Sequence, residues 1–93
     1  MHARVSTYQF APDAIDKASE QFDSAMNELD DDMKGAVLLV DRTTGKGMTI
    51  TYWESQETLA SSRQAADRVR SAAAQAASGS IESVEEYEVL LER

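Results

Sequence analysis

The clearest pattern in this chain is a pair of apolar segments separated by a short turn. Residues 36–40 form an uncharged apolar run, AVLLV, which is typical of a strand buried on both faces. Residues 48–53, MTITYW, are rich in β-branched and aromatic side chains, and TGKG between the runs supplies two glycines that can adopt positive φ. The pattern predicts a β-hairpin over residues 36–53, followed by a helix with Ser55 as its N-cap.

Two further segments repeat their apolar residues with the period of an α-helix. The first begins at Pro12, a residue suited to a first helical turn, and is expected to end near residues 29–30, where three successive aspartates oppose the helix dipole. The second runs from Ser55 to Gly79, and its face of small side chains allows close packing on a sheet. The predicted buried faces are Ile15, Ala18, Phe22, Ala25, Met26 and Leu29 in the first helix, and Leu59, Ser62, Ala66, Val69, Ala73 and Ala76 in the second.

Strand patterns occupy both ends of the chain. Residues 2–10 alternate with period two, but neither face is uniformly polar, so the sequence leaves open which face meets the helices. Residues 81–91 are rich in glutamate and break strict alternation, which predicts a β-bulge near Glu85 or Glu86. Their charge is typical of an edge strand protected against pairing, or of a strand whose polar side faces water.

The predicted order is strand, helix, strand, strand, helix, strand. This order is that of a ferredoxin-like α+β fold, in which two helices cover one face of a four-stranded antiparallel sheet. The other face carries apolar residues from the hairpin strands, among them Met48, Ile50 and Tyr52. We therefore expect residues 1–93 to form a single domain that associates with a second copy through this sheet face, as a dimeric α+β barrel.

Composition narrows the possible functions. The chain carries 17 acidic and 9 basic residues, a formal charge of −8, which disfavours binding to nucleic acid. It has no cysteine, which excludes disulfides and thiol nucleophiles. It shows neither an apolar run long enough to cross a bilayer nor an apolar leader, so we expect a cytoplasmic protein without membrane contact.

Two charged groups are interpreted as solvated surface. The second helix carries three arginines, and Asp67 lies four residues after the first of them and beside the second. This mixture of charges is typical of an ordinary exposed helix face. The three arginines are Arg63, Arg68 and Arg70. Residues 30–32, all aspartate, lack the spacing of a calcium loop. We therefore expect no metal site.

The segment at residues 48–59, MTITYWESQETL, resembles the strand-to-helix junction of the dimeric α+β barrel superfamily. The resemblance is strongest to the antibiotic biosynthesis monooxygenase-like group, in which a Trp-Glu-Ser triplet recurs at this position. That group includes cofactor-independent oxygenases of polycyclic aromatic substrates, haem-degrading enzymes and members without an assigned reaction. The resemblance implies the dimeric fold and a possible cofactor-independent monooxygenase activity.

The polar residues of both enzyme branches are replaced in this chain. In the oxygenases acting on aromatic polyketides, an asparagine lies four residues before the tryptophan and a tyrosine six residues after it. Here Trp53 is retained, while Thr49 and Leu59 occupy those two positions. The haem-degrading branch uses a first-strand asparagine and a second-helix histidine, and this chain has neither. We accordingly expect no cofactor.

The candidate site lies around Trp53, the best candidate for a catalytic residue. Thr49, Thr51 and Trp53 share one strand face, and with Leu59 and Phe22 they are expected to line a pocket for a small apolar or aromatic molecule between sheet and helices. The competing interpretation makes Trp53 a core residue whose indole N–H bonds a nearby carbonyl. The corresponding functions are a monooxygenase and a non-catalytic dimeric module that binds a ligand or a partner.

Three other groups have competing interpretations. Arg4 and Tyr8 could orient an anionic or phenolic ligand, but an ion pair between Arg4 and a glutamate of the last strand is favoured. Tyr52 and Tyr87 are interpreted as packing on the dimer face. Glu54 is expected to be exposed, which disfavours it as a general base.

Overall fold

Four antiparallel strands form one sheet with the strand order β2-β3-β1-β4. The computed structural model describes residues 1–26 and 33–93. The predicted end of the first helix and the three aspartates lie outside these residues. The strands are β1 (His2–Gln9), β2 (Met33–Val40), β3 (Lys46–Trp53) and β4 (Ser80–Glu88).

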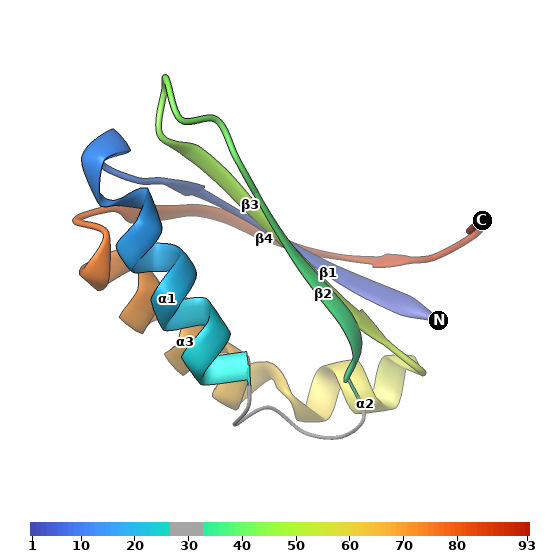
Figure 1. The fold of residues 1–93 in the computed structure, drawn as a ribbon. Helices are drawn as coiled ribbons and strands as arrows, with labels where there is room; N and C mark the ends of the chain where they lie inside the picture. The colour runs from blue at the N-terminus through green and yellow to red at the C-terminus, as the bar shows by residue number, and fades with distance from the viewer. Residues whose placement is uncertain (27–32) are drawn as a thin grey trace.

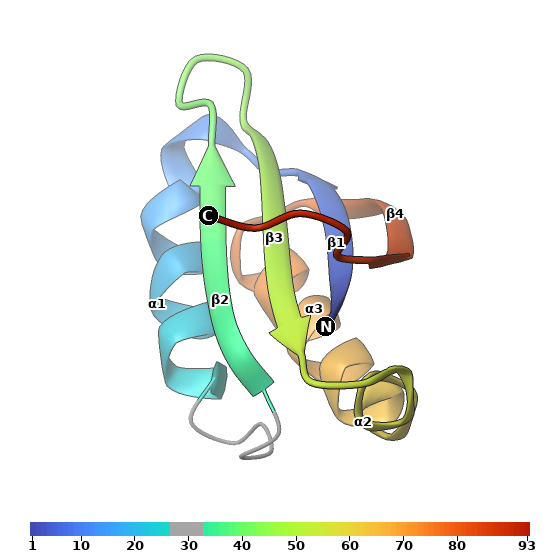
Figure 2. The same ribbon diagram turned by 90° about the vertical axis from the view of Figure 1, so that its right-hand side faces the viewer.

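The helices lie on one side of this sheet. A short 3₁₀ turn, η1 (Pro12–Ala14), leads into α1 (Ile15–Met26), and α2 (Gln56–Ser61) is followed by α3 (Arg63–Ala76). α1 and α3 run side by side across one face of the sheet, and α2 lies beneath one end of it (Figures 1 and 2). This arrangement confirms the predicted α+β, ferredoxin-like fold. Among the described residues, no helix combines the length and apolar composition needed to cross a membrane.

The prediction of one continuous helix from Ser55 to Gly79 is wrong, because the helix breaks at Ser62. The Ser62 hydroxyl donates to the carbonyl of Leu59 at 2.7 Å, and an Arg4 guanidinium nitrogen donates to the same oxygen at 2.8 Å. These bonds occupy the carbonyl that would otherwise accept the next helical N–H, so side-chain donors replace the backbone ladder at this point. The result is a short α2 with its C-terminal end tied to β1.

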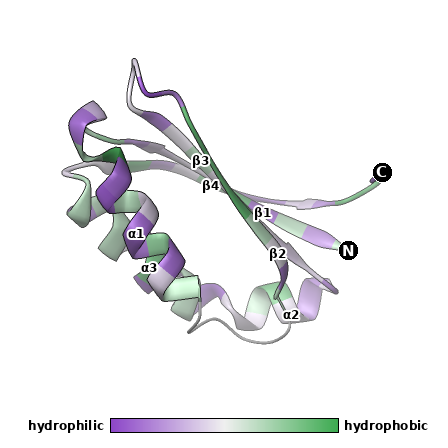
Figure 3. Cartoon of the chain, viewed as in Figure 1, coloured by the Kyte–Doolittle hydropathy of each residue, from purple (hydrophilic) through white to green (hydrophobic). Residues whose placement is uncertain are grey.

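β2 differs from its predicted environment. The apolar run was expected to be buried on both faces, but β2 is an edge strand in which Val37 is 43% exposed and Leu39 52% exposed. Their partners across the ladder are Ile50 and Met48 of β3. Together with Val5, these four residues form the apolar centre of the sheet face away from the helices, here called the outer face. The colouring of Figure 3 marks β2 as hydrophobic over much of its length. Among the residues that the structure describes, no helix covers this face.

The bulge in β4 lies three residues before its predicted position. The β1–β4 register shifts between Thr7, which pairs with Ser83, and Tyr8, which pairs with Ile81, so Glu82 is the inserted residue. A bulge at Glu85 or Glu86 would have placed Val84 and Tyr87 on one face of the sheet. They instead lie on opposite faces by ordinary alternation, and β4 ends at Glu88 rather than at residue 91.

The core lies between the sheet and the two long helices. Tyr8 points into it, which decides the orientation of β1 that the sequence left open. The Tyr8 ring stacks on Phe10 at 5.1 Å between ring centroids and meets Phe22 edge-on at 5.5 Å. Small residues of α3 let this helix approach the aromatic cluster closely. The buried core residues are Tyr8, Phe10, Ala14, Ile15, Ala18, Phe22, Ala25, Val69, Ala73 and Ala77.

The predicted N-cap at Ser55 is confirmed and gives a first test. Its hydroxyl accepts from the N–H of Thr58 at 3.2 Å, and its own N–H donates to the Thr58 hydroxyl at 3.2 Å. We predict that Ser55→Ala lowers the free energy of unfolding by about 1 kcal/mol in urea denaturation. Ser71→Ala, at an exposed position inside α3, should change it by less than about 0.5 kcal/mol. Equal effects of the two substitutions would show that the cap contributes nothing.

Candidate functional site

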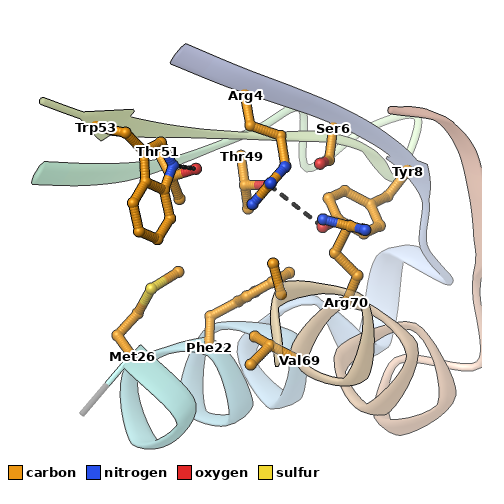
Figure 4. A pocket seen from close by; sticks show the side chains of 11 residues that line it. Arg4, Ser6, Tyr8, Phe22, Met26, Thr49, Thr51, Trp53, Val69 and Arg70 are labelled. Carbon is orange, nitrogen blue, oxygen red and sulfur yellow. Dashed lines mark hydrogen bonds between the residues drawn. The ribbon is translucent and has the colours of Figure 1, made fainter. Parts of the chain in front are cut away.

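A pocket lies between the inner face of the sheet and the two long helices (Figure 4). Its free volume is about 20 Å³, enough for about one water molecule. Of the five residues expected at a ligand pocket, Phe22, Thr49, Thr51 and Trp53 are in its lining, whereas Leu59 is buried outside its wall. The lining residues are Arg4, Ser6 and Tyr8 of β1, Thr49, Thr51 and Trp53 of β3, Phe22 and Met26 of α1, and Ala66, Val69 and Arg70 of α3.

A second, more open hollow of about 190 Å³ lies between α1 and β2. Phe22, Met26 and Thr49 line both spaces, so these side chains form the partition between them. Met26 is only half-buried, and an unbranched methionine side chain changes rotamer at low cost. The 20 Å³ pocket is too small for an aromatic ring as it stands, so a ring-sized ligand would require this partition to move.

Trp53 closes one end of the pocket and is fully buried. Its indole N–H donates to the Thr51 hydroxyl at 3.0 Å, where the sequence interpretation expected a carbonyl acceptor. The carbon of the Arg4 guanidinium lies 5.7 Å from the centre of the indole ring, within range of a cation–π interaction. Trp53 therefore packs in the core and at the same time presents its ring to the pocket.

Tyr8 and Thr49 form a hydroxyl pair further along the pocket. The Tyr8 hydroxyl lies 3.2 Å from the Thr49 hydroxyl, and either oxygen can be the donor. Burial raises the pKa of Tyr8 above its ordinary value, against smaller opposing effects of hydrogen bonds from Thr49 and Ser6. The phenol is consequently neutral at physiological pH and can donate a hydrogen bond to a ligand.

Arg4 is the most heavily bonded side chain of the site. Its guanidinium donates to the carbonyl of Leu59, to the Ser62 hydroxyl at 3.3 Å and to Glu86 at 3.3 Å. The last contact confirms the ion pair predicted for Arg4. Burial is the largest influence on Arg4 and lowers its pKa, but a guanidinium keeps its charge throughout the physiological range.

Glu86 is shared between two arginines. Arg63, on the surface of α3, donates to both of its oxygens at 2.6 and 3.1 Å, in a bidentate arrangement. The hydrogen bond from Arg63 is the largest cause of the lowered pKa of Glu86, and Arg4 adds to the same effect. Glu86 therefore stays ionised well into the acidic range.

The solvated-face interpretation of the α3 arginines is wrong for Arg70. Arg63 and Arg68 are exposed, but Arg70 is only 9% exposed and its side chain lines the pocket. The guanidinium donates to Asp67 over a long 3.4 Å, and its Nε is buried without a hydrogen-bond partner. A signal was present in the sequence, because position 70 lies four residues after Ala66 and three before Ala73, within the apolar stripe.

The remaining candidates lie away from the pocket. Tyr87 is half-exposed on the outer face, where its hydroxyl donates to Glu85 at 2.7 Å, and Tyr52 lies on the same face. The Glu54 side chain is 70% exposed, as predicted, and forms an ion pair with Lys34 at 3.5 Å. Within residues 1–26 and 33–93, no cluster of three or more His, Cys, Asp or Glu side chains could hold a metal.

Comparison with known proteins shows which fold this chain has. No protein-family model matches this sequence, and no curated protein matches it. Among solved structures, Rv0793 from Mycobacterium tuberculosis aligns with a TM-score of 0.71 and 16% identity over 98% of this chain and 96% of that chain. A proposed antibiotic biosynthesis monooxygenase from Deinococcus radiodurans aligns with a TM-score of 0.69 and 11% identity over 100% and 96% of the two chains. The chain has an antibiotic biosynthesis monooxygenase-like fold.

A third similar structure is SnoaB from Streptomyces nogalater, described as a cofactor-independent oxygenase. It aligns with a TM-score of 0.68 and 13% identity over 98% of this chain and 94% of that chain. The resemblance to the antibiotic biosynthesis monooxygenase-like group, inferred from residues 48–59, is thus confirmed for the fold. At such identities the likeness concerns the fold, and activity has to be argued from the pocket itself.

The shared carboxylate of Glu86 gives the second test. Because its pKa is held below the ordinary value of 4.5, the ionised group stabilises the fold above that pH, and the contribution is lost as pH falls through the lowered pKa. We predict that Glu86→Gln lowers the free energy of unfolding by about 2 kcal/mol at neutral pH, since it leaves a buried guanidinium without its counter-charge. The difference from the unmodified protein should shrink as the pH is lowered below 4.5.

The exposed neighbour Glu88 supplies the control for this experiment. Glu88→Gln removes the same charge from the same strand and should change stability by less than about 0.5 kcal/mol. A pH-independent difference between the Glu86→Gln protein and the unmodified one would contradict the assigned role of this carboxylate.

Proposed function

We propose that this protein binds a small electron-rich aromatic molecule beside Trp53 and oxidises it with molecular oxygen, as a cofactor-independent monooxygenase. The observation that carries the proposal is the buried pocket in which the Trp53 ring and the Tyr8–Thr49 hydroxyl pair face the same space. The fold of SnoaB, described as a cofactor-independent oxygenase, supports it. An apolar cavity with a few convergent polar groups is the usual composition of a small-ligand site.

In the proposed reaction, a methylene carbon between aromatic rings becomes a carbonyl. The substrate supplies both hydrogens and all the electrons, one atom of O₂ enters the product, and the other leaves as water. The roles of the chain are to orient the ring against Trp53, to donate a hydrogen bond to the ring oxygen from the neutral Tyr8 phenol, and to exclude bulk water.

The direct test is oxygen uptake with anthrone-type and quinol substrates. We predict that Trp53→Phe lowers the rate about tenfold, because the smaller ring orients the substrate less well. Gln75→Ala, an exposed change on α3, should leave the rate unchanged. Absence of oxygen consumption by the unmodified, folded protein, or an unaltered rate in the Trp53→Phe protein, would exclude this activity.

A non-catalytic ligand-binding module is the alternative function, and two residues favour it. Thr49 stands where the resembling oxygenases carry an asparagine, and its hydroxyl is already paired with Tyr8. Leu59 replaces the tyrosine of that group and lies outside the pocket wall. Binding of an aromatic ligand without oxygen uptake would support this alternative.

We also propose that a second copy of the chain covers the outer face. Val37 and Leu39 expose large apolar side chains there beside Ile50 and Met48, and an apolar patch of this kind usually marks an interaction surface. Two sheets stacked through such faces would form a barrel-like sandwich with twofold symmetry.

Sedimentation equilibrium tests this association. We predict a species of twice the 10.2 kDa chain mass at micromolar concentration, and a monomer for Leu39→Lys, which places a charge in the centre of the outer face. Ser71→Lys on α3 adds the same charge to the helical side and should leave the dimer intact. A monomeric unmodified protein would remove this proposal.

A further inference from the structure

We propose that the aromatic ligand of this pocket is an anion, whose carboxylate, phenolate or enolate oxygen is bound by Arg70 while its ring lies against Trp53. The inference rests on the proposed small-ligand site but does not depend on any oxygenation. Its basis is a pair of buried guanidinium groups, those of Arg4 and Arg70, in the wall of one pocket.

Arg70 has bonding capacity that the chain does not use. Its side chain is 10% exposed, and its one ion-pair partner, Asp67, lies 3.4 Å away with 71% of its side chain exposed to solvent. Its buried Nε has no hydrogen-bond partner within residues 1–26 and 33–93. A buried donor on a charged group without an acceptor is costly for a fold, and an acceptor that enters the pocket with a ligand would remove this cost.

The neighbouring carboxylates do not neutralise the cluster. Arg4, Arg63 and Arg70 contribute three positive charges, and Glu86 and Asp67 contribute two negative ones. Glu86 is already divided between Arg4 and Arg63. One positive charge is therefore left beside the pocket, in a chain whose formal charge is −8. The local field thus selects an anion even though the protein as a whole repels anions.

The direction of the side chains fits a planar ligand with one acidic end. Arg70 reaches into the pocket next to the Tyr8 hydroxyl, whereas Trp53 lies at the opposite end (Figure 4). Between the two ends, the helical wall is apolar and contains Phe22, Val69 and Met26. Once the partition towards the hollow between α1 and β2 has opened, a ligand would place its ring among these side chains and its acidic oxygen against Arg70, with the Tyr8 phenol as a second donor.

A path from solvent to Arg70 exists on the other side of the cluster. An open hollow of about 490 Å³ between α3 and β4 is lined by Arg4, Arg63 and Arg70 together with Glu86. Arg4 and Arg70 also line the pocket, so their guanidinium groups stand between the two spaces. An anion approaching from solvent would meet the exposed Arg63 first and the buried arginines afterwards.

The test compares two ligands of the same shape, benzoate and the uncharged benzamide. Binding is followed by the fluorescence of Trp53, the single tryptophan of the chain. We expect benzoate to bind about tenfold more tightly than benzamide at low salt, because only the anion accepts charge-assisted hydrogen bonds from a guanidinium. In Arg70→Met, which keeps the length of the apolar stem, the two ligands should bind equally.

Two controls separate this role from a structural one. Arg68→Met removes an exposed arginine of the same helix and should keep the tenfold preference. The Arg70→Met protein should unfold at the same temperature as the unmodified protein or a higher one, since an incompletely paired buried charge is replaced by an apolar side chain.

Each outcome decides between the proposals. Equal binding of benzoate and benzamide to the unmodified protein would overturn the anion preference and leave the aromatic pocket standing. A preference that survives in the Arg70→Met protein, or a large loss of stability there, would overturn the assignment of Arg70. Failure of both ligands to bind at millimolar concentration would overturn the anion proposal and the pocket proposal together.

Discussion

The buried guanidinium of Arg4 is the interaction on which the rest of the structure depends. It starts from β1, in the interior of the sheet, and bonds the last turn of α2, the Ser62 break and Glu86 of β4. The same group lies over the Trp53 ring, at the end of β3. A single charged side chain thus links three strands and the helical layer. Because its charge cannot be removed by titration, the surrounding acceptors have to be arranged around it.

The need to surround the permanent charge of Arg4 with acceptors explains why the two ends of the pocket differ. At the Trp53 end, the indole N–H is satisfied within its own strand by Thr51, and the remaining surface is a ring face. At the Arg70 end, the guanidinium lies near the neutral Tyr8 phenol and donates a long hydrogen bond to the Asp67 carboxylate. The first half is complete without a ligand, whereas the second retains an unused donor. The proposed ligand would therefore be recognised by shape at one end and by charge at the other.

Periodicity predicted much of the fold and less of the site. The stripe of α1, the Ser55 cap and the orientation of Thr49, Thr51 and Trp53 all follow from local patterns, because each depends on neighbours in sequence. The break at Ser62 depends on a side chain that arrives from β1. The position of Arg70 in the apolar stripe of α3 indicated its burial, but the polar side chains that line the pocket with it come from β1 and β3. A pattern of charges within one helix contains no information about such partners. The position of β2 at the edge of the sheet was not predicted for the same reason. An apolar run can form either a central strand or an edge strand, and the sequence of the run does not distinguish the two.

The two edge strands of the sheet, β2 and β4, differ in how readily a further strand could pair with them. β4 carries four carboxylates along its length, at Glu82, Glu85, Glu86 and Glu88, and its bulge disturbs the spacing of its free backbone groups. β2 carries the single charge of Lys34 and otherwise only apolar residues and glycine. Backbone pairing with another extended chain is therefore disfavoured at β4 and unopposed at β2. Charge therefore protects one border of the sheet against a further strand and leaves the other border without this protection.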